Sequence, residues 1–115
     1  MYHVAISINP NDLHALFNLT NTFFKTRDLD KAVKYYEKVI SLEPKYIDAY
    51  NNLGTVLIHL RNYSKAKECY EKAIQYSTDN AAIYYNYAIT LYELGEVDEA
   101  NINNEIAMSL LKDTK

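Results

Sequence analysis

The sequence predicts an all-α fold, an α-solenoid in which antiparallel helix pairs stack side by side. The first observation is a pair of helical runs joined by a short turn, with apolar and small residues at the i, i+3, i+4, i+7 spacing of one helix face. The first run contains Tyr50, Leu53, Gly54 and Leu57, and the second contains Ala66, Tyr70, Ala73 and Ile74. The second observation is that this pattern recurs at a fixed interval along the chain. The third is that only 2 Gly and 2 Pro are present, which leaves little room for long loops.

The repeat interval is 34 residues, a period that is diagnostic of repeat architectures. Identities between the first two units at this interval are Ala15/Ala49, Asn18/Asn52, Leu19/Leu53, Arg27/Arg61, Lys31/Lys65, Ala32/Ala66, Tyr36/Tyr70, Glu37/Glu71, Lys38/Lys72 and Ile40/Ile74. The pattern continues one interval downstream at Tyr84, Tyr87, Ala88, Leu91, Ala100 and Ala107. A helix–turn–helix pattern with this period resembles the tetratricopeptide repeat over essentially the whole chain. The resemblance implies a right-handed superhelix of about seven helices.

In this register the chain is a single array with three whole units. Residues 13–46, 47–80 and 81–114 form repeats 1, 2 and 3, and residues 1–12 form the second helix of a truncated preceding repeat. The assignment of residues 1–12 depends on Tyr2, Ala5 and Pro10, which match Tyr36, Val39 and Pro44 in phase. We therefore expect the chain to be part of a longer array. The alternative is a native N-terminal helix that merely falls in phase.

The helices follow from their start and stop signals. A helix over residues 2–8 should end before Pro10, and Asn11 or Asp12 can cap the next helix, which runs to about residue 25. Its partner should reach about residue 42 and end before Pro44. The second pair is expected over residues 46–59 and 63–76, with Asp79-Asn80 as the cap that follows. The third pair is expected over residues 81–93 and 97–111.

Each turn within a unit needs a residue that tolerates positive φ after the first helix. Gly95 supplies it in the third unit, whereas Arg27 and Arg61 occupy this position in the other two. A side chain in this conformation costs on the order of 1 kcal/mol. We expect packing of the helix pairs to offset that cost.

Composition and charge exclude several function classes. The formal net charge of -3 argues against nucleic acid or an anionic membrane as the main partner. No apolar run approaches a membrane span and the N-terminus does not resemble a signal peptide, so an intracellular, cytoplasmic location is expected. Cys69 is the only cysteine, so no disulfide framework or cysteine metal cluster is expected. His3, His14 and His59 lack metal-ligand or catalytic spacing, so we expect no enzyme activity, metal or cofactor.

The resemblance places function on the inner face of the superhelix, which the first helix of each pair mainly lines. Asn18, Asn52 and Asn86 recur there at the repeat interval and are expected to form a ladder. An Asn amide offers two donors and an acceptor, so it can bind both the N–H and the C=O of an extended peptide. The alternative is that these amides only make contacts between helices.

Six more residues are expected to line this peptide-binding groove: Phe17, Asn21, Lys25, Asn51, His59 and Tyr85. Phe17, Phe24, Tyr85 and Tyr92 are expected to be at least half exposed, as aromatic anchors of an interface. The alternative for these aromatic residues is packing between units. The series Lys25, His59, Glu93 would orient a bound chain, although isolated rim charges contribute little affinity.

Two families sharpen this hypothesis. The Asn-Asn-Leu-Gly of residues 51–54 resembles the repeat domain of O-GlcNAc transferases, whose groove asparagines hold substrate backbones, but no residue here supplies glycosyl-transfer chemistry. Co-chaperone modules of the same family clamp a C-terminal carboxylate with three cations and two asparagines. Those positions fall here on Phe17, Asn21, Asn52, Ala82 and Asn86. Both asparagines are present and all three cations are missing, so a carboxylate clamp is disfavoured.

The predicted function is therefore protein–protein recognition, with an extended peptide of a partner bound in the concave groove. Two alternatives stay open: an internal structural segment of a multi-subunit scaffold, or the substrate-recruiting part of an enzyme similar to O-GlcNAc transferase. Asn104 replaces the tyrosine of the earlier units, while Ile102, Ile106 and Met108 remain apolar. We therefore expect self-association through the exposed ends of the array.

Overall fold

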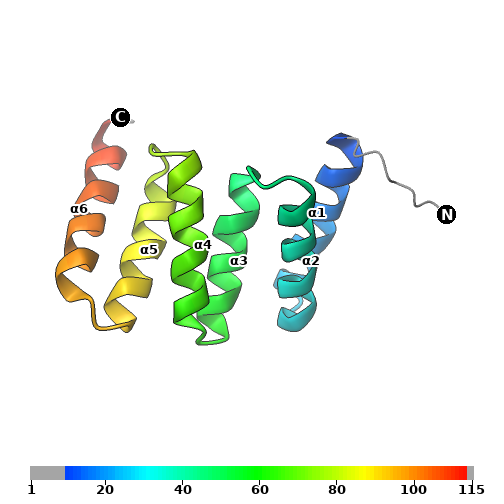
Figure 1. Ribbon diagram of the computed structural model, residues 1–115, viewed down its shortest axis with the longest axis horizontal. Coiled ribbons are helices and arrows are strands. Elements are labelled where there is room, and N and C mark those ends of the chain that lie inside the picture. Colours follow the sequence, from blue (N-terminus) through cyan, green and yellow to red (C-terminus); the bar gives the residue numbers. More distant parts are fainter. Residues whose placement is uncertain (1–9, 114–115) are drawn as a thin grey trace.

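The computed structural model describes residues 10–113, which form six helices in three antiparallel pairs (Figure 1). The helices are α1 (Pro10–Lys25), α2 (Leu29–Leu42), α3 (Ile47–His59), α4 (Tyr63–Tyr76), α5 (Ala81–Glu93) and α6 (Val97–Asp113). Residues 10–113 contain no strand, and the pairs follow one another along the long axis of the molecule. The all-α solenoid is thus confirmed. The helix expected over residues 2–8 lies outside the described residues.

Asparagine side chains cap two of the helices, one of them at a predicted place. Asn80 Oδ1 accepts hydrogen bonds from the backbone N–H of Ala82 (3.0 Å) and of Ile83 (3.3 Å), so it caps α5 as expected. Asn62 caps α4 in the same way. The cap expected at Asn11 or Asp12 was wrong, because α1 begins at Pro10 and includes both residues. Proline suits the first position of a helix, where a backbone N–H has no helical partner.

The three turns within the units share one backbone conformation. Arg27 and Arg61 have φ of 67° and 62°, and Gly95 has φ of 86°. The residue after each of them donates a backbone hydrogen bond of 2.8–2.9 Å to the carbonyl five residues earlier, as in Asp28 to Phe23. This is the pattern of a Schellman motif, which satisfies the last carbonyls of the first helix. The expectation of positive φ at both arginines is confirmed.

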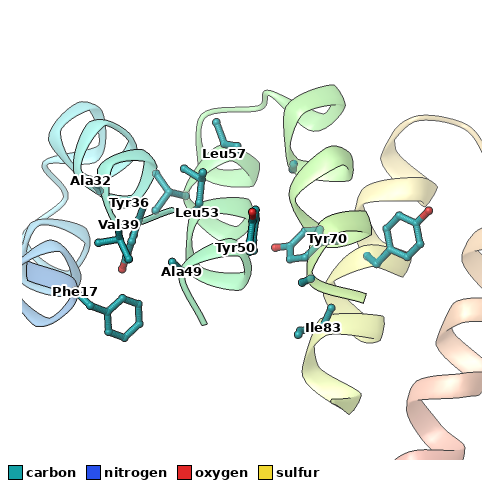
Figure 2. Close-up of a cluster of buried hydrophobic side chains, with 14 of the residues drawn as sticks. Phe17, Ala32, Tyr36, Val39, Ala49, Tyr50, Leu53, Leu57, Tyr70 and Ile83 are labelled. Carbon is teal, nitrogen blue, oxygen red and sulfur yellow. The ribbon is translucent and has the colours of Figure 1, made fainter. Parts of the chain in front are cut away.

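One continuous core runs through the array (Figure 2). Its small residues let the helices approach, and its tyrosines fill the space between successive units. Tyr36 and Tyr70 are fully buried, as the sequence predicts. Tyr50 is buried as well, and its hydroxyl donates a 2.8 Å hydrogen bond to the carbonyl of Pro44, which fastens the joint between units 1 and 2.

The stack is curved, because its first helices lie closer together than its second helices. Cα atoms of α1 and α3, and of α3 and α5, approach within 8 Å. In the described part of the chain, α2 and α4 have no such approach, nor do α4 and α6. The inner side of the curve is therefore made by α1, α3 and α5, which we call the first-helix face. The opposite side, made by α2, α4 and α6, is the second-helix face.

Candidate functional site

Pairs of asparagine side chains link consecutive units on the first-helix face. At the joint between units 1 and 2, Nδ2 of Asn52 donates to Oδ1 of Asn21 over 3.0 Å. At the next joint, Nδ2 of Asn86 donates to Oδ1 of Asn51 over 3.1 Å. Each bond joins neighbouring first helices, α1 to α3 and α3 to α5. All four amides belong to the predicted binding set.

These four asparagine side chains form what we call the amide row, and a buried hydroxyl group contacts it at the first joint. The Tyr36 hydroxyl donates to Oδ1 of Asn21, so this oxygen accepts two hydrogen bonds. Burial raises the pKa of Tyr36 to about 12, although the Asn52 side chain acts in the opposite direction. The Tyr36 hydroxyl therefore stays protonated and keeps its donor role at neutral pH. In unit 2, the Thr55 and Tyr70 hydroxyls lie 3.1 Å apart.

The three asparagines of the expected ladder are in two different states. Asn52 and Asn86 are half-buried and each uses one amide N–H in the bond to the preceding unit. Asn18 is exposed, and its side chain makes no hydrogen bond within residues 10–113. An amide has a second N–H and an oxygen with two lone pairs, so Asn52 and Asn86 keep groups that can bind a ligand.

The aromatic residues of the predicted groove differ in exposure. Tyr85 and Tyr92 are exposed. The exposure expected for Phe17 was wrong, because only 8% of this residue is accessible. Its ring packs against Tyr46, with ring centroids 4.9 Å apart, and against Tyr36 at 6.0 Å. Phe17 therefore fills the joint between units 1 and 2, and it has little surface to offer a ligand.

The predicted rim residues lie at the C-terminal ends of the first helices. Lys25 is exposed in the last turn of α1. His59 is exposed at the end of α3, where its ring meets Phe24 edge-on with centroids 5.6 Å apart. Contact between Phe24 of unit 1 and His59 of unit 2 shows that the rim, like the amide row, runs across the joint.

Sequence reasoning placed the asparagines on one face but missed their pairing. The ladder was derived from equivalent positions, which are separated by the repeat interval. The bonded pairs join non-equivalent positions, Asn21 to Asn52 and Asn51 to Asn86. The sequence does contain a signal for this pairing. The first helix of the unit before Asn52 carries Asn21, and the first helix of the unit before Asn86 carries Asn51. Such pairs depend on the offset between adjacent helices, which a repeat period alone does not give.

Three family models match successive parts of the chain. A tetratricopeptide-repeat model matches residues 47–80, a TPR-repeat model matches residues 21–60, and a further tetratricopeptide-repeat model matches residues 69–100. The first of these coincides with the second unit derived from the sequence period. The chain belongs to the tetratricopeptide-repeat family. No curated protein shows significant sequence similarity to this tetratricopeptide-repeat chain.

Solved structures share the fold. A crystal structure of MamA superposes with a TM-score of 0.84 at 25% identity, covering 89% of this chain and 60% of MamA. The first TPR domain of Spaghetti (RPAP3), bound to the HSP90 peptide SRMEEVD, has a TM-score of 0.86 at 19% identity and covers 92% and 84% of the two chains. The Yersinia enterocolitica type III secretion translocator chaperone SycD, in an alternative dimer, has a TM-score of 0.87 at 20% identity, with coverage of 92% and 80%. This tetratricopeptide-repeat chain thus spans less than two thirds of MamA.

Neither a metal site nor a membrane span is found in the part of the chain that the structure describes. Within residues 10–113, no three His, Cys, Asp or Glu side chains are grouped so as to hold a metal ion. None of the six helices is long and apolar enough to cross a membrane. The first-helix face thus combines amide groups with exposed aromatic rings. As a member of the tetratricopeptide-repeat family, the chain is a protein-interaction module.

Proposed function

We propose that the first-helix face binds an extended segment of a partner protein, mainly through the segment's main chain. The observation that carries this proposal is the amide row, in which Asn21–Asn52 and Asn51–Asn86 occupy two successive joints of one face. The bonds between units hold these amides in place, so little side-chain entropy is lost when a ligand binds. Their unused N–H and C=O groups match the two polar groups of a peptide bond.

Side-chain preference would come from the ends of the same face. Tyr85 and Tyr92 are 54% and 63% exposed on α5, and exposed tyrosines are common anchors of interfaces. Lys25 and His59 lie at the rim, where they would orient a ligand more than hold it. This set of contacts favours a segment with at least one apolar side chain and no strong net charge.

The Spaghetti domain has the same fold and was solved with an HSP90 peptide, which supports peptide binding by this chain as well. The ligand must differ in kind, however. Phe17, Ala82 and Asn86 occupy the places where the co-chaperone clamp carries its cations. Phe17 is also buried, so the first unit presents no donor there. A terminal carboxylate would lack its counter-charges, and we expect an internal segment of the partner to bind.

A peptide selected from a random display library against the chain tests this proposal. We expect the Asn18→Ala/Asn52→Ala/Asn86→Ala variant to bind the peptide at least about tenfold more weakly, since three hydrogen-bonding groups are lost. N-methylation of the peptide backbone should weaken binding by a similar factor. Asn103→Ala, on α6, is the matched control and should bind normally.

Helix content from circular dichroism checks that the triple variant is folded. If its joints are loosened, Asn18→Ala alone still tests the ladder, because the Asn18 side chain makes no hydrogen bond within the described residues. Unchanged affinity in a folded triple variant, or full tolerance of N-methylation, would overturn main-chain recognition.

A second candidate function is self-association through the last unit. The exposed large apolar residues concentrate there: Tyr85, Tyr92, Val97, Ile102, Ile106, Met108 and Leu111. Tyr85 corresponds by the repeat interval to Asn51, which faces the following unit through Asn86. The last unit thus presents a surface that, in unit 2, receives the next first helix. We propose that a second copy covers it, and Tyr92→Lys/Met108→Lys should then abolish any dimer seen by light scattering.

A further inference from the structure

The second-helix face carries a hollow of about 500 Å³ between α2 and α4. Because the curvature separates these two helices, side chains of α3 form part of the floor. The floor is apolar and consists of Ile40, Tyr50, Leu53 and Cys69. The rim is polar and consists of Glu37, Glu68, Glu71, Lys72 and Gln75. The volume of the hollow lies within the range of ligand pockets, which is roughly 300–1,000 Å³.

The floor is fixed and uncharged. Tyr50 and Leu53 belong to the buried core, and the Tyr50 hydroxyl is held by the carbonyl of Pro44. Burial and the nearby carboxylates of Glu68 and Glu37 raise the pKa of Cys69 to about 12, although the ammonium group of Lys65 acts in the opposite direction. The thiol is therefore neutral at physiological pH and acts as part of an apolar surface. A preformed apolar floor suits an apolar side chain.

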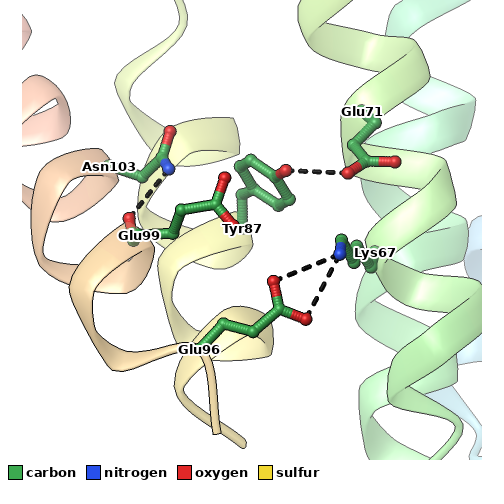
Figure 3. Close-up of polar contacts among 6 residues, drawn as sticks. All are labelled: Lys67, Glu71, Tyr87, Glu96, Glu99 and Asn103. Atoms are coloured by element: carbon green, nitrogen blue, oxygen red, sulfur yellow. Dashed lines mark hydrogen bonds and ion pairs between the residues drawn. The ribbon is translucent and has the colours of Figure 1, made fainter. Parts of the chain in front are cut away.

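The rim is negative. The lining contains three carboxylates and a single ammonium group, that of Lys72, so the lining residues carry a net charge of −2. The negative strip continues across α4, because Glu68 and Glu71 also border a neighbouring hollow that includes Lys67 and Glu96. Lys67 Nζ lies 3.2 and 3.3 Å from the two carboxylate oxygens of Glu96, so this lysine pairs chiefly with Glu96 (Figure 3).

The hydroxyl group of Tyr87 contacts one of these carboxylates, that of Glu71. The Tyr87 hydroxyl donates a 2.9 Å hydrogen bond to Oε2 of Glu71, as Figure 3 shows. Burial raises the pKa of Tyr87, and the charges of Glu71, Glu99 and Glu96 raise it further. Glu71 on α4, Glu96 in the turn before α6 and Glu99 on α6 thus act together on one side of α4, and the carboxylates of α2 and α4 act on the other. Glu71 belongs to both groups.

We propose that this hollow is a second docking site, which takes an apolar side chain of a partner segment flanked by Lys or Arg. The apolar floor provides the pocket for the side chain, and the carboxylates of Glu37 and Glu68 provide partners for the flanking cations. An acidic segment would be repelled by the same rim. The site lies on the face opposite the amide row, so the chain can engage two segments at once. The proposal is independent of peptide binding on the first-helix face.

The test uses a fluorescent, acetylated peptide with a leucine–phenylalanine pair flanked on each side by two lysines. Binding is followed by fluorescence anisotropy. We expect Glu37→Gln/Glu68→Gln to weaken binding by about 2- to 30-fold, the range given by two exposed ion pairs. Glu43→Gln/Glu105→Gln removes the same charge from residues that do not line the hollow and should bind normally. A peptide with serine and asparagine in place of the apolar pair should bind much more weakly.

Cys69 reports where the peptide binds, because it is the only cysteine of the chain and lines the hollow. Saturating peptide should slow its modification by a small aromatic disulfide at least severalfold. Absence of binding up to millimolar peptide would overturn the proposal. So would equal loss of affinity in the two double variants, equal binding of the polar peptide, or binding that leaves the rate of Cys69 modification unchanged.

Discussion

The ring of Tyr70 packs directly over the Cα atom of Gly54, and a Cβ atom added at residue 54 would lie 2.5 Å from Cζ of that ring. Tyr70 has little freedom to move away. It is fully buried, and its hydroxyl lies 3.1 Å from Oγ1 of Thr55. The contact joins the two helices of unit 2, so residue 54 must lack a side chain while Tyr70 is present.

We expect Gly54→Ala to lower the free energy of unfolding by about 1–2 kcal/mol. Overpacking typically costs about 1–3 kcal/mol. The better helix propensity of alanine returns up to about 1 kcal/mol. Urea unfolding followed by circular dichroism measures the difference. In a Tyr70→Leu background the clash is absent, so the same substitution should become neutral or stabilising. A stabilising effect of Gly54→Ala in the natural background would contradict the packing argument.

The turns make a reciprocal prediction. Arg61→Gly removes a side chain from a residue with φ of 62°, so it relieves backbone strain. Glycine also gives the unfolded chain more entropy, which opposes this gain. The free energy of unfolding should rise by up to about 1 kcal/mol. Gly95→Arg is the matched reversal at φ of 86°, where no atom lies near an added Cβ, so it should destabilise by about 1 kcal/mol through backbone strain alone. The two midpoints in urea should therefore move in opposite directions, and a shift in the same direction would show that the arginine side chain makes a compensating contact.

The fold could be predicted because the repeat period fixes many features at once. A helix pair that recurs at the same interval sets the helix bounds, the buried positions of Tyr36 and Tyr70, and the residues with positive φ. The site was harder. The burial of Phe17 depends on Tyr46 from the loop before the next unit, which meets its ring at 4.9 Å. A contact of this kind is set by the geometry of the joint and is not visible in the periodic pattern.

The hollow on the second-helix face illustrates the same limit. The sequence shows Glu37 and Glu71 at equivalent positions, which suggests only a solvated helix surface. Whether such residues border a pocket depends on how far α2 stands from α4, and hence on the curvature of the stack. Curvature arises from the sum of many small side-chain volumes at the joints, so it emerges only in three dimensions.

Stability should fall at alkaline pH in a defined window. Burial raises the pKa of Tyr36 to about 12 and raises those of Tyr70 and Tyr87, whereas an unfolded tyrosine titrates near 10. Between about pH 10 and 12 the unfolded chain therefore loses protons that the folded chain retains, and the free energy of unfolding decreases as pH rises. Each tyrosine contributes at most about 1.4 kcal/mol per pH unit. Cys69, with its pKa also raised, begins to contribute somewhat below that window.

Urea midpoints measured under reducing conditions, from neutral pH into this window, check the prediction. The midpoint should be insensitive to these groups at neutral pH and should fall once the unfolded tyrosines ionise. Tyr87→Phe removes one of the three groups and should make the fall shallower. A midpoint that stays constant while the tyrosine absorbance shows ionisation would mean that these hydroxyls are accessible in the folded chain.

The amide pair at the first joint predicts unequal costs for two similar substitutions. Asn21→Ala removes the acceptor of both the Tyr36 hydroxyl and Nδ2 of Asn52, and it leaves a fully buried tyrosine without that partner. The expected loss in the free energy of unfolding is about 1–3 kcal/mol, the cost of an unsatisfied buried polar group. Asn18→Ala changes an exposed residue on the same helix and should cost less than about 0.5 kcal/mol. In a Tyr36→Phe background, the two asparagine substitutions should cost nearly the same free energy of unfolding, because the tyrosine hydroxyl that Asn21→Ala leaves without a partner is then absent. Equal costs for the two asparagines would mean that the pair contributes nothing to the joint, and that its amides are free to serve a ligand alone.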